Sequence, residues 1–292
     1  MIVCVGDIVT DVLAAVHGPI APGSDTPASI QVCGGGQAAN TASWLAAAGA
    51  PVTLVAAVGD DQAGRERVAE LTAAGVRVAA QVCPGASTGA IVVLTDRGDR
   101  TMITDRGANL LLSADSVDAA LPGADWLHLS AYTLLGMPEI GRHALAQARA
   151  HGLRVSVDAA SAQPLRDAGP ARFLSWVRPT DVLFTNADEA AVLAGRGPAR
   201  EQALRLAEAV GGSAVVKLGA RGAVWARTSG EVHAAPAPEV AAVDTTGAGD
   251  AFAAGLLAAL AAGRDPATAL HEAVRWGSRA VAALGARPRI PA

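Results

Sequence analysis

The chain has 292 residues, of which 51% are hydrophobic and only 17% are charged, and this composition excludes a disordered protein. The net charge is −4 without any block of Lys or Arg, so we expect no nucleic-acid partner. Three widely spaced cysteines without a C-x-x-C pair argue against a disulfide framework, and neither a signal peptide nor a membrane-spanning stretch is visible. We therefore expect a cytoplasmic protein that does not bind membranes.

Short apolar strands and two helices are predicted for the first third of the chain. In order, the segments are Met1–Gly6, Asp11–Val16, Ala28–Cys33, Gly36–Ala48, Val52–Val58 and Ala63–Ala74, of which the fourth and the sixth are helices. Thr88–Thr95 and Arg100–Thr104 then form a hairpin around a turn at 96–99. The strand pairs within 11–33 and 88–104 do not alternate with helices, so we expect a small separate sheet beside the main body.

Strands and helices alternate regularly from residue 114 onward. The predicted helices are Ala114–Leu121, Pro138–Ala150, Ala187–Ala194, Glu201–Val210, Ala248–Ala262 and Pro266–Leu284. The predicted strands are Trp126–Leu129, Arg154–Asp158, Val182–Thr185, Ala214–Leu218, Ala223–Arg227 and Glu231–Ala235, the last two as a second hairpin. This alternation predicts β-α units on a largely parallel sheet, and we expect one α/β domain over residues 1–292.

The strongest functional signal is the sequence DTTGAGDAF at 244–252, directly before an Ala- and Leu-rich helix. Gly247 and Gly249 let the backbone approach a ligand closely, and the helix start offers unpaired N–H groups to an anion. A carboxylate in that first turn, Asp250, can take the proton from a hydroxyl that attacks phosphorus. The alternative is that Asp250 only caps its helix, but the length and place of the motif favour the functional interpretation.

A second signal is the sequence GGGQAAN at 34–40, just after an extended segment. Its glycines allow backbone N–H groups to contact polar oxygens, and Asn40 can both donate and accept hydrogen bonds. Two alternatives remain. The motif can be a tight strand-to-helix turn, or Gly34-x-Gly36-x-x-Ala39 can be a loose dinucleotide fingerprint, although such a fingerprint should follow the first strand.

Together, the two motifs resemble the signatures of the phosphofructokinase-B-type carbohydrate kinases, the ribokinase-like family. Two intermediate segments agree in order and spacing: NADE at 186–189 resembles the N-x-x-E motif of the family, and KLGARG at 217–222 resembles its nucleotide loop. The resemblance covers nearly the whole chain. It implies a doubly wound α/β body with a mostly parallel sheet flanked by helices, a small β-sheet lid, and Mg²⁺- and ATP-dependent phosphorylation of a sugar or nucleoside hydroxyl.

The resemblance also implies roles for the matching residues. Asp250 would be the general base, and charge on the transferring phosphoryl group would be stabilised by the amides of Gly247, Ala248 and Gly249. The hydroxyls of the substrate would be held by Asp11, Gly34, Gly35, Gly36 and Asn40, with Asp250 beside them. The nucleotide site would be lined by Asn186, Lys217, Gly219, Gly222 and Gly249, and Glu189 with Asn186 would position Mg²⁺ through water.

For three of these residues, a purely structural role stays open as an alternative. Asp11 can be an exposed charge on an edge strand, Glu189 a solvated carboxylate in a first helical turn, and Asn186 an N-cap only. Lys217, the only lysine of the chain, would supply a point charge near phosphates, although many family members have Thr there.

Some family members bind a monovalent cation through residues that match Asp244 and Thr246 and through carbonyls near the C-terminus, around Gly285. Arg289 stands where ribokinases tend to have a small polar residue, which leaves activation by K⁺ open. Family members also often bury the lid in a dimer, so we expect a homodimer.

Arg106 lies in a segment that resembles the part of sugar kinases that closes over the substrate. It can meet a substrate carboxylate or phosphate as a bidentate fork, or it can be a surface arginine paired with Asp105. Three Phe and one Tyr in the whole chain favour a sugar over a nucleoside, although Trp44 or Trp126 can stack on a base.

Two other classes of function remain as alternatives. One is a dinucleotide-dependent oxidoreductase, based on Gly34 and Gly36, and the other is a non-catalytic ligand-binding module that keeps the fold. Asp250 argues against the second, because a module that only binds has no need of a base at an anion site.

Overall fold

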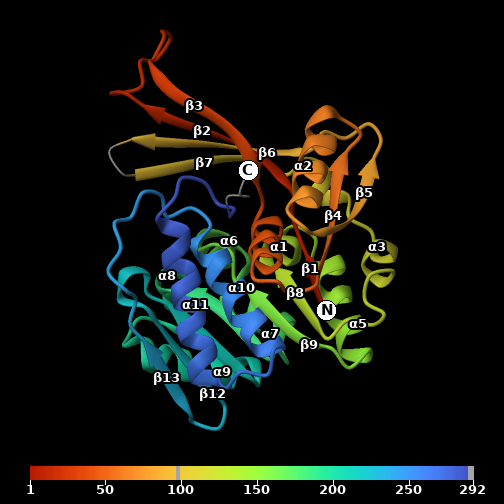
Figure 1. The fold of residues 1–292 in the computed structure, drawn as a ribbon, viewed down its shortest axis with the longest axis vertical. Helices are drawn as coiled ribbons and strands as arrows, with labels where there is room; N and C mark the ends of the chain where they lie inside the picture. Colours follow the sequence, from red (N-terminus) through yellow and green to blue (C-terminus); the bar gives the residue numbers. More distant parts are fainter. Residues whose placement is uncertain (97–98, 289–292) are drawn as a thin grey trace.

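A computed structural model describes residues 1–96 and 99–288 of the chain. A large sheet with helices on both faces forms the body, and a smaller sheet projects from one end of it as a lid (Figure 1). Residues 97–98, the middle of the turn predicted at 96–99, and Arg289 lie outside the described residues. Within the described part of the chain, no helix has the length and apolar character needed to cross a membrane.

The body sheet has nine strands in the order β13-β12-β11-β10-β9-β8-β1-β4-β5. The strands from β11 to β5 pair in parallel, whereas β12 and β13 are antiparallel at one edge. Their bounds are β1 Ile2–Val5, β4 Val52–Gly59, β5 Arg77–Cys83, β8 Trp126–Ser130, β9 Arg154–Asp158, β10 Val182–Asn186, β11 Ser213–Lys217, β12 Ala223–Arg227 and β13 Val232–Ala235.

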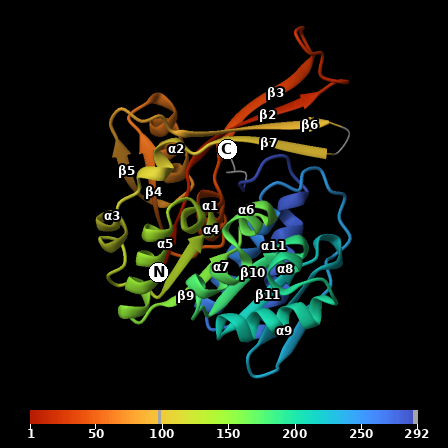
Figure 2. The same cartoon turned by 180° about the vertical axis from the view of Figure 1, so that it is seen from behind.

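Alternate residues of the parallel strands point into two separate hydrophobic clusters, which is why these strands are apolar throughout. The first cluster lies under α1 (Gln37–Ala47), α2 (Gln62–Ala73), α10 (Ala248–Ala261) and α11 (Pro266–Val281). The second cluster, on the opposite face (Figure 2), is covered by α3 (Ala114–Asp118), α4 (Ala131–Gly136), α5 (Pro138–Ala150), α6 (Ala162–Ala168), α7 (Pro170–Val177), α8 (Ala187–Ala194) and α9 (Ala199–Val210). The doubly wound α/β body that the resemblance implied is confirmed.

The lid sheet has four strands in the order β3-β2-β6-β7. Its strands are β2 Val9–Val16, β3 Ala28–Gly35, β6 Gly89–Asp96 and β7 Asp99–Asp105. Two antiparallel hairpins, β2–β3 and β6–β7, are joined by a parallel pairing of β2 with β6. The separate small sheet expected from the two irregular strand pairs is therefore confirmed, with one parallel contact at its centre.

The chain passes between body and lid four times, at 6–8, 35–36, 84–88 and 106–107. Because β1 leads directly into the lid strand β2, the carboxyl end of β1 faces the lid (Figure 1). The parallel strands β8 to β11 end at the same edge of the sheet. In doubly wound sheets this edge is where ligands bind.

Several predicted bounds were wrong in ways that have simple causes. The sequence did not predict the edge strand β5, whose apolar run is short and interrupted by Gln81, or the short helices α4, α6 and α7. Helix α3 ends at Asp118 and not at 121, and α11 ends at Val281 and not at 284. Helix ends are the least sharply specified part of a periodic pattern.

Candidate functional site

Polar side chains gather where consecutive parallel strands end, at the edge of the body sheet that faces the lid. Asp7 follows β1, Ser130 ends β8, Asp158 ends β9, Asn186 ends β10 and Lys217 ends β11. The register pairs Ser130 with Asp158 and Asn186 with Lys217, so these side chains lie on adjacent strands. Helix α10 completes this site from the other half of the chain.

Helix α10 begins at Ala248 after Gly247, whose φ of +75° lies in the left-handed region. A Cβ on Gly247 would lie 2.3 Å from the carbonyl oxygen of Ala286, so only glycine fits this turn. No side chain of the described residues caps the start of α10, and the N–H of Ala248 donates at 3.4 Å to the carbonyl oxygen of Thr245. The N–H groups that follow in the first turn, beginning with Gly249, are the donors that this helix start offers to an anion.

Asp250 lies in the first turn of α10 and is half-buried. Its Oδ2 accepts a hydrogen bond of 3.0 Å from Nδ2 of Asn40, on helix α1. Burial and the neighbouring charge of Asp158 raise the pKa of Asp250 to about 8, against the opposing effects of the Asn40 hydrogen bond and the Lys217 charge. The site therefore brings together two residues that the sequence predicted, 210 positions apart.

Lys217 supplies the positive charge next to Asp250. Its Nζ lies 2.7 Å from Oδ2 of Asp158, and a Cβ on Gly249 would lie 3.2 Å from the same Nζ. The missing side chain of Gly249 thus leaves room for the ammonium group at the start of α10. Although burial opposes ionisation, the charges of Asp158, Glu189 and Asp250 raise the pKa of Lys217 and keep it protonated.

Asn186 and Glu189 form a capping box at the start of α8. The Glu189 carboxylate accepts from Nδ2 of Asn186 at 2.6 Å and from its backbone N–H at 2.8 Å. Asn186 is therefore the N-cap of α8, and this position also places it at the edge of the sheet where the site lies. The solvated interpretation of Glu189 is wrong, because Glu189 is 2% exposed, and burial together with the charge of Asp158 raises its pKa to about 7.

The glycine motif brings the lid strand β3 close to the body and to Asp11. A Cβ on Gly35 would lie 2.2 Å from Oδ2 of Asp11, and Gly36, with φ of +101°, would place a Cβ 2.4 Å from the carbonyl oxygen of Asp7. Asp11 is buried on the central strand β2, so the edge-strand interpretation is wrong. Burial raises the pKa of Asp11 to about 6, against the opposing charge of Arg287.

The same motif lacks the context of a dinucleotide fingerprint, because Gly34 and Gly36 follow a lid strand and not the first strand of the body sheet. The glycines leave room for Asp11 on the neighbouring lid strand and for the backbone of Asp7 in the connection from β1 to β2, as the contacts of Gly35 and Gly36 require.

Arg106 does not pair with Asp105, whose carboxylate accepts the backbone N–H of Gly107 at 3.0 Å. Its guanidinium instead lies 3.3 Å from Oδ2 of Asp7 and 4.0 Å above the centre of the Tyr132 ring. Because Asp7 also accepts the backbone N–H of Ala38, at the start of α1, Arg106 borders the predicted substrate side of the site.

The two glycines of the predicted nucleotide loop differ in their surroundings. Gly219, with φ of +59°, has open space where a Cβ would lie. At Gly222, with φ of +90°, a Cβ would lie 1.9 Å from the carbonyl oxygen of Ala235. Gly222 therefore owes its identity to its left-handed backbone and to the close approach of Ala235, at the end of β13.

Asp244, Thr246 and Gly285, the residues predicted for a monovalent cation, lie together. Oδ1 of Asp244 accepts from the backbone N–H and the hydroxyl of Thr246 at 2.9 and 2.7 Å, and its Oδ2 accepts from the N–H of Gly285 at 3.0 Å. Through these hydrogen bonds, Asp244 connects the loop before α10 to the C-terminal segment.

Sequence reasoning missed Asp7, Gln37, Asp158 and Arg287 at this site. Gln37 donates to Oδ1 of Asp158 at 3.1 Å and accepts from the hydroxyl of Ser130 at 2.6 Å, which connects α1 to the strand ends. The position of Asp158, at the last residue of a correctly predicted parallel strand, was a signal that could have found it.

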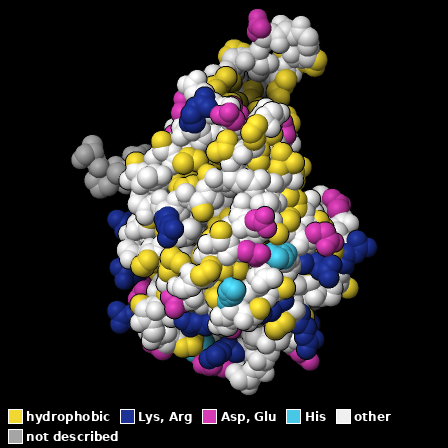
Figure 3. All heavy atoms as spheres, turned by 90° about the vertical axis from the view of Figure 1, so that its right-hand side faces the viewer, with side chains coloured by type: hydrophobic (Ala, Val, Ile, Leu, Met, Phe, Trp, Pro, Cys, Tyr) yellow, Lys and Arg dark blue, Asp and Glu magenta, His cyan; other side chains and the backbone are white. Residues whose placement is uncertain are grey.

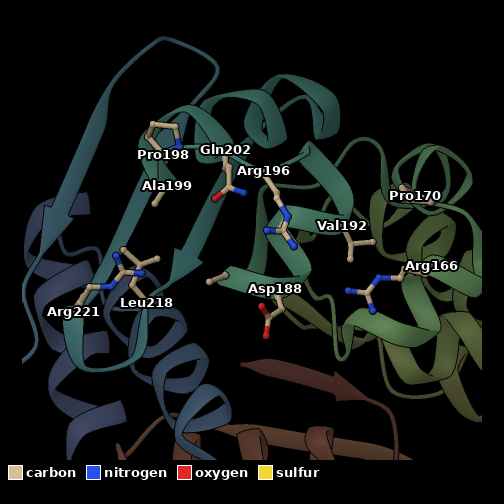
Figure 4. A pocket seen from close by; sticks show the side chains of 13 residues that line it. Arg166, Pro170, Asp188, Val192, Arg196, Pro198, Ala199, Gln202, Leu218 and Arg221 are labelled. Carbon is tan, nitrogen blue, oxygen red and sulfur yellow. The ribbon is translucent and has the colours of Figure 1, made fainter.

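A cleft of about 790 Å³ adjoins the site next to both predicted nucleotide segments. Ala187, Asp188, Leu218 and Arg221 contribute to its lining, and Figure 4 shows the guanidinium groups of Arg166 and Arg196 entering the same space from the opposite wall. The residues that line this cleft are Arg166, Pro170, Ala187, Asp188, Ala191, Val192, Arg196, Gly197, Pro198, Ala199, Gln202, Leu218 and Arg221. Three arginines against one aspartate give it a positive character.

The fold and the site together define a small-molecule phosphotransferase: a general-base candidate, an open helix start and a lysine meet at the ligand edge of a doubly wound sheet under a lid. Residues 1–292 match the model of the pfkB family carbohydrate kinases, and the chain belongs to that family. The sequence-based prediction of an ATP-dependent sugar kinase is confirmed at this level, and a nucleoside acceptor is also compatible with the family.

Individual relatives show the range of acceptors. The chain is 32% identical over 278 residues to an ATP-dependent ribose-1-phosphate kinase of Halopiger xanaduensis, covering 92% of this chain and 87% of that protein. It is similar to the adenosine kinase of Sinorhizobium meliloti, with a TM-score of 0.86, 25% identity and coverage of 99% and 96%. It is also similar to an E. coli protein provisionally designated ribokinase II, in complex with ATP and Mg²⁺, with a TM-score of 0.84, 26% identity and coverage of 98% and 94%.

Proposed function

We propose that this protein transfers the γ-phosphate of ATP to a sugar hydroxyl, with Asp250 as the general base. The observation that carries the proposal is the position of Asp250 in the first turn of α10, with Asn40 at 3.0 Å on one side and Lys217 on the other. A carboxylate with its pKa raised to about 8 accepts a proton more readily than an ordinary aspartate, which suits it to a hydroxyl.

Charge that develops on the transferring phosphoryl group would meet the amides of Gly247, Ala248 and Gly249 and the ammonium group of Lys217. These groups are fixed before the reaction, because Gly247 packs on Ala286 and Lys217 is paired with Asp158. Preorganised donors of this kind stabilise a transition state without reorganisation at the moment of reaction. The positive cleft beside Leu218 supports a phosphate-bearing nucleotide on this side of the site.

The acidic residues around Lys217 fit a divalent cation. Asp158 and Glu189 share the single positive charge of Lys217, and a bound cation would favour the ionised form of Glu189, whose pKa is raised. Both oxygens of Glu189 already accept from Asn186, so these two residues would hold Mg²⁺ through water. Among the described residues, no group of three or more His, Cys, Asp or Glu is arranged to bind a metal directly. Bound Mg²⁺ would offset the charge of the ATP phosphates.

A sugar is favoured over a nucleoside as the acceptor. Trp126 is fully enclosed in the core, and Trp44 packs edge-on against Trp276 while its Nε1 donates to the carbonyl oxygen of Ala286 at 2.9 Å. Neither ring is available to stack on a base, and the face of the Tyr132 ring is covered by Arg106. Base recognition relies on such faces, whereas sugar hydroxyls need the polar groups of Asp11 and Asn40.

Measurement of ADP release tests this function. The wild-type enzyme with MgATP should release ADP in the presence of one or more members of a panel of pentoses, hexoses, keto-deoxy sugar acids, sugar phosphates and nucleosides. Asp250→Asn should lower turnover by roughly 10²–10⁴-fold while the affinity for ATP is kept. Unchanged turnover in Asp250→Asn would exclude Asp250 as the base, and tight NAD binding without ATP binding would favour the oxidoreductase.

We also propose that two copies of the chain associate through the lid. Val12, Val32, Val92 and Ile103 face one another in register across all four lid strands, on the side opposite Asp11. Val32 and Ile103 are 61% and 58% exposed in the single chain. The lid stands clear of the body with hydrophobic side chains open to solvent (Figure 3), which is typical of a surface that a partner covers.

A monovalent cation would be held near the start of α10 by Asp244, Thr246 and Gly285. A comparison of turnover in potassium and tetramethylammonium salts tests this site.

A cytoplasmic location is the last proposal. The three cysteines are unpaired, which supports a reducing compartment.

A further inference from the structure

The C-terminal segment at 284–288 runs beneath the lid and is held at several points along its backbone. Trp44 donates to the carbonyl oxygen of Ala286 at 2.9 Å, and the N–H of Gly285 donates to Asp244 at 3.0 Å. Gly247, at the start of α10, packs directly on the backbone of Ala286. These contacts therefore fix the position of the backbone at the next residue, Arg287.

Arg287 extends from this segment to the glycine motif and to Asn40. Its Nε donates to Oδ1 of Asn40 at 3.1 Å, and its Nη2 donates to the carbonyl oxygen of Gly35 at 2.8 Å. Its Nη1 lies 3.7 Å from Glu70, and the side chain is largely buried. A Cβ on Gly34 would lie 2.3 Å from Nη1, so the first glycine of the motif makes room for this guanidinium.

The chemistry of the guanidinium decides how the Asn40 amide is oriented. A guanidinium has donors only, so the atom of Asn40 that faces Arg287 must be the oxygen. The nitrogen of the same amide then faces Asp250 and donates to it at 3.0 Å. Without Arg287, rotation of the amide by 180° would turn a lone pair toward the carboxylate, in place of a donor.

We propose that Arg287 is a positioning residue that locks the Asn40 amide and thereby orients the Asp250 carboxylate toward the acceptor hydroxyl. This inference rests on the proposed role of Asp250 as the base. It also assigns a purpose to a buried cation that donates to two neutral oxygens at the substrate side and lies 3.7 Å from the carboxylate of Glu70.

Charged groups from several elements face Arg287 and Asp250, the two residues that Asn40 connects. Arg287 is faced by Glu70 and Arg67 from α2 and by Asp11 and Cys33 from the lid. Asp250 is faced by Asp158, Lys217 and Asp7. The hydrogen bond that Asn40 donates lowers the pKa of Asp250 and so opposes the effect of burial. Loss of the contact between Arg287 and Asn40 should therefore raise that pKa further.

The test compares Arg287→Met and Arg287→Lys with Arg264→Met, an exposed arginine beyond the end of α10. We expect the acidic limb of kcat/KM to move to higher pH by about one unit in Arg287→Met, with kcat lowered more than KM is raised. Arg287→Lys, which can still donate to Asn40, should return part of that shift, and Arg264→Met should match the wild type. An unmoved acidic limb with a raised KM alone would overturn the proposal and make Arg287 a substrate-binding group.

A double-mutant cycle with Asn40→Ala separates this inference from a general loss of stability. If Arg287 acts through Asn40, Arg287→Met should change the acidic limb in the wild-type background but not in Asn40→Ala. Equal shifts in both backgrounds would overturn the proposal. Failure of the proposed function would appear differently, as unchanged turnover in Asp250→Asn, and melting temperatures of all variants show whether each is folded.

Discussion

The amide of Asn40 donates a 3.0 Å hydrogen bond to the carboxylate of Asp250 and accepts one of 3.1 Å from Arg287. Helix α1, helix α10 and the C-terminal segment thus meet in a single side chain. Because α1 begins directly after the glycine motif of the lid strand β3, this amide also connects the lid to the base. A contact of this kind makes specific changes in activity predictable.

Asn40→Ala should lower kcat/KM by about 10–100-fold, because a hydrogen bond to a charged group contributes roughly 1.5–3 kcal/mol. The acidic limb of the pH profile should also move upward, since the lost donor had opposed the raised pKa of Asp250. The matched control is Ser43→Ala, whose hydroxyl donates only to the carbonyl oxygen of Ala39 in the same helix. A pH profile unchanged by Asn40→Ala would show that the amide does not act on the base.

Asp250→Asn should stabilise the protein at alkaline pH. The folded pKa of about 8 lies above the ordinary value of 3.8, so the folded state binds more protons, and stability is lost as pH rises between these two values. The side-chain amide that Asp250→Asn introduces does not ionise, so the variant does not lose stability in this way. Above pH 8 we expect the melting temperature of Asp250→Asn to exceed that of the wild type by at least about 3 °C, with a smaller difference at pH 5. A difference independent of pH would contradict the raised pKa.

Lys217→Met should both inactivate and destabilise the protein. Asp158 is buried and would lose the ammonium group at 2.7 Å, and an unpaired buried charge costs about 3–5 kcal/mol. Adding Asp158→Asn removes that charge and should restore the melting temperature without restoring turnover. Arg227→Met is the control, because it breaks an exposed pair with Glu231 and should leave the melting temperature almost unchanged. Recovery of turnover in the double variant would show that Lys217 serves stability alone.

Val32→Asp should convert a dimer into a monomer, because it places a charge at the β3 end of the apolar row that Val32, Val12, Val92 and Ile103 form across the lid. Light scattering would then give a mass near 29.1 kDa in place of twice that value. Met102→Asp introduces the same charge on the other face of the lid, where register sets Met102 opposite Val93, and should leave the mass unchanged. A wild-type mass of 29.1 kDa at micromolar concentration would rule out the dimer.

The sequence predicted those features that follow from a local pattern. Apolar runs and glycine breaks located most strands of the body, and the residues around 250 and 34–40 indicated the helix start and the glycine turn because each motif is contiguous. Asp250 and Asn40 could be named separately, but no local pattern could show that the two side chains touch. That contact depends on how α1 and α10 pack on the same face of the sheet.

The residues that were missed act through distant partners. Asp158 becomes a site residue only because the parallel pairing of β9 with β10, and of β10 with β11, brings its side chain to Lys217. Arg287 was noted only as part of a segment that supplies carbonyls, and its role depends on a reach across the chain to the glycine motif. Three-dimensional proximity of this kind leaves no periodic trace in the sequence.

The four passages of the chain between body and lid are also the segments that carry Asp7, Gly36 and Arg106. The backbone that joins the lid to the body therefore also forms the wall of the predicted substrate side. A substitution chosen there to admit a different acceptor would also alter the connections that hold the lid in place. Engineering of acceptor selectivity at these positions is therefore expected to change the geometry of the lid as well.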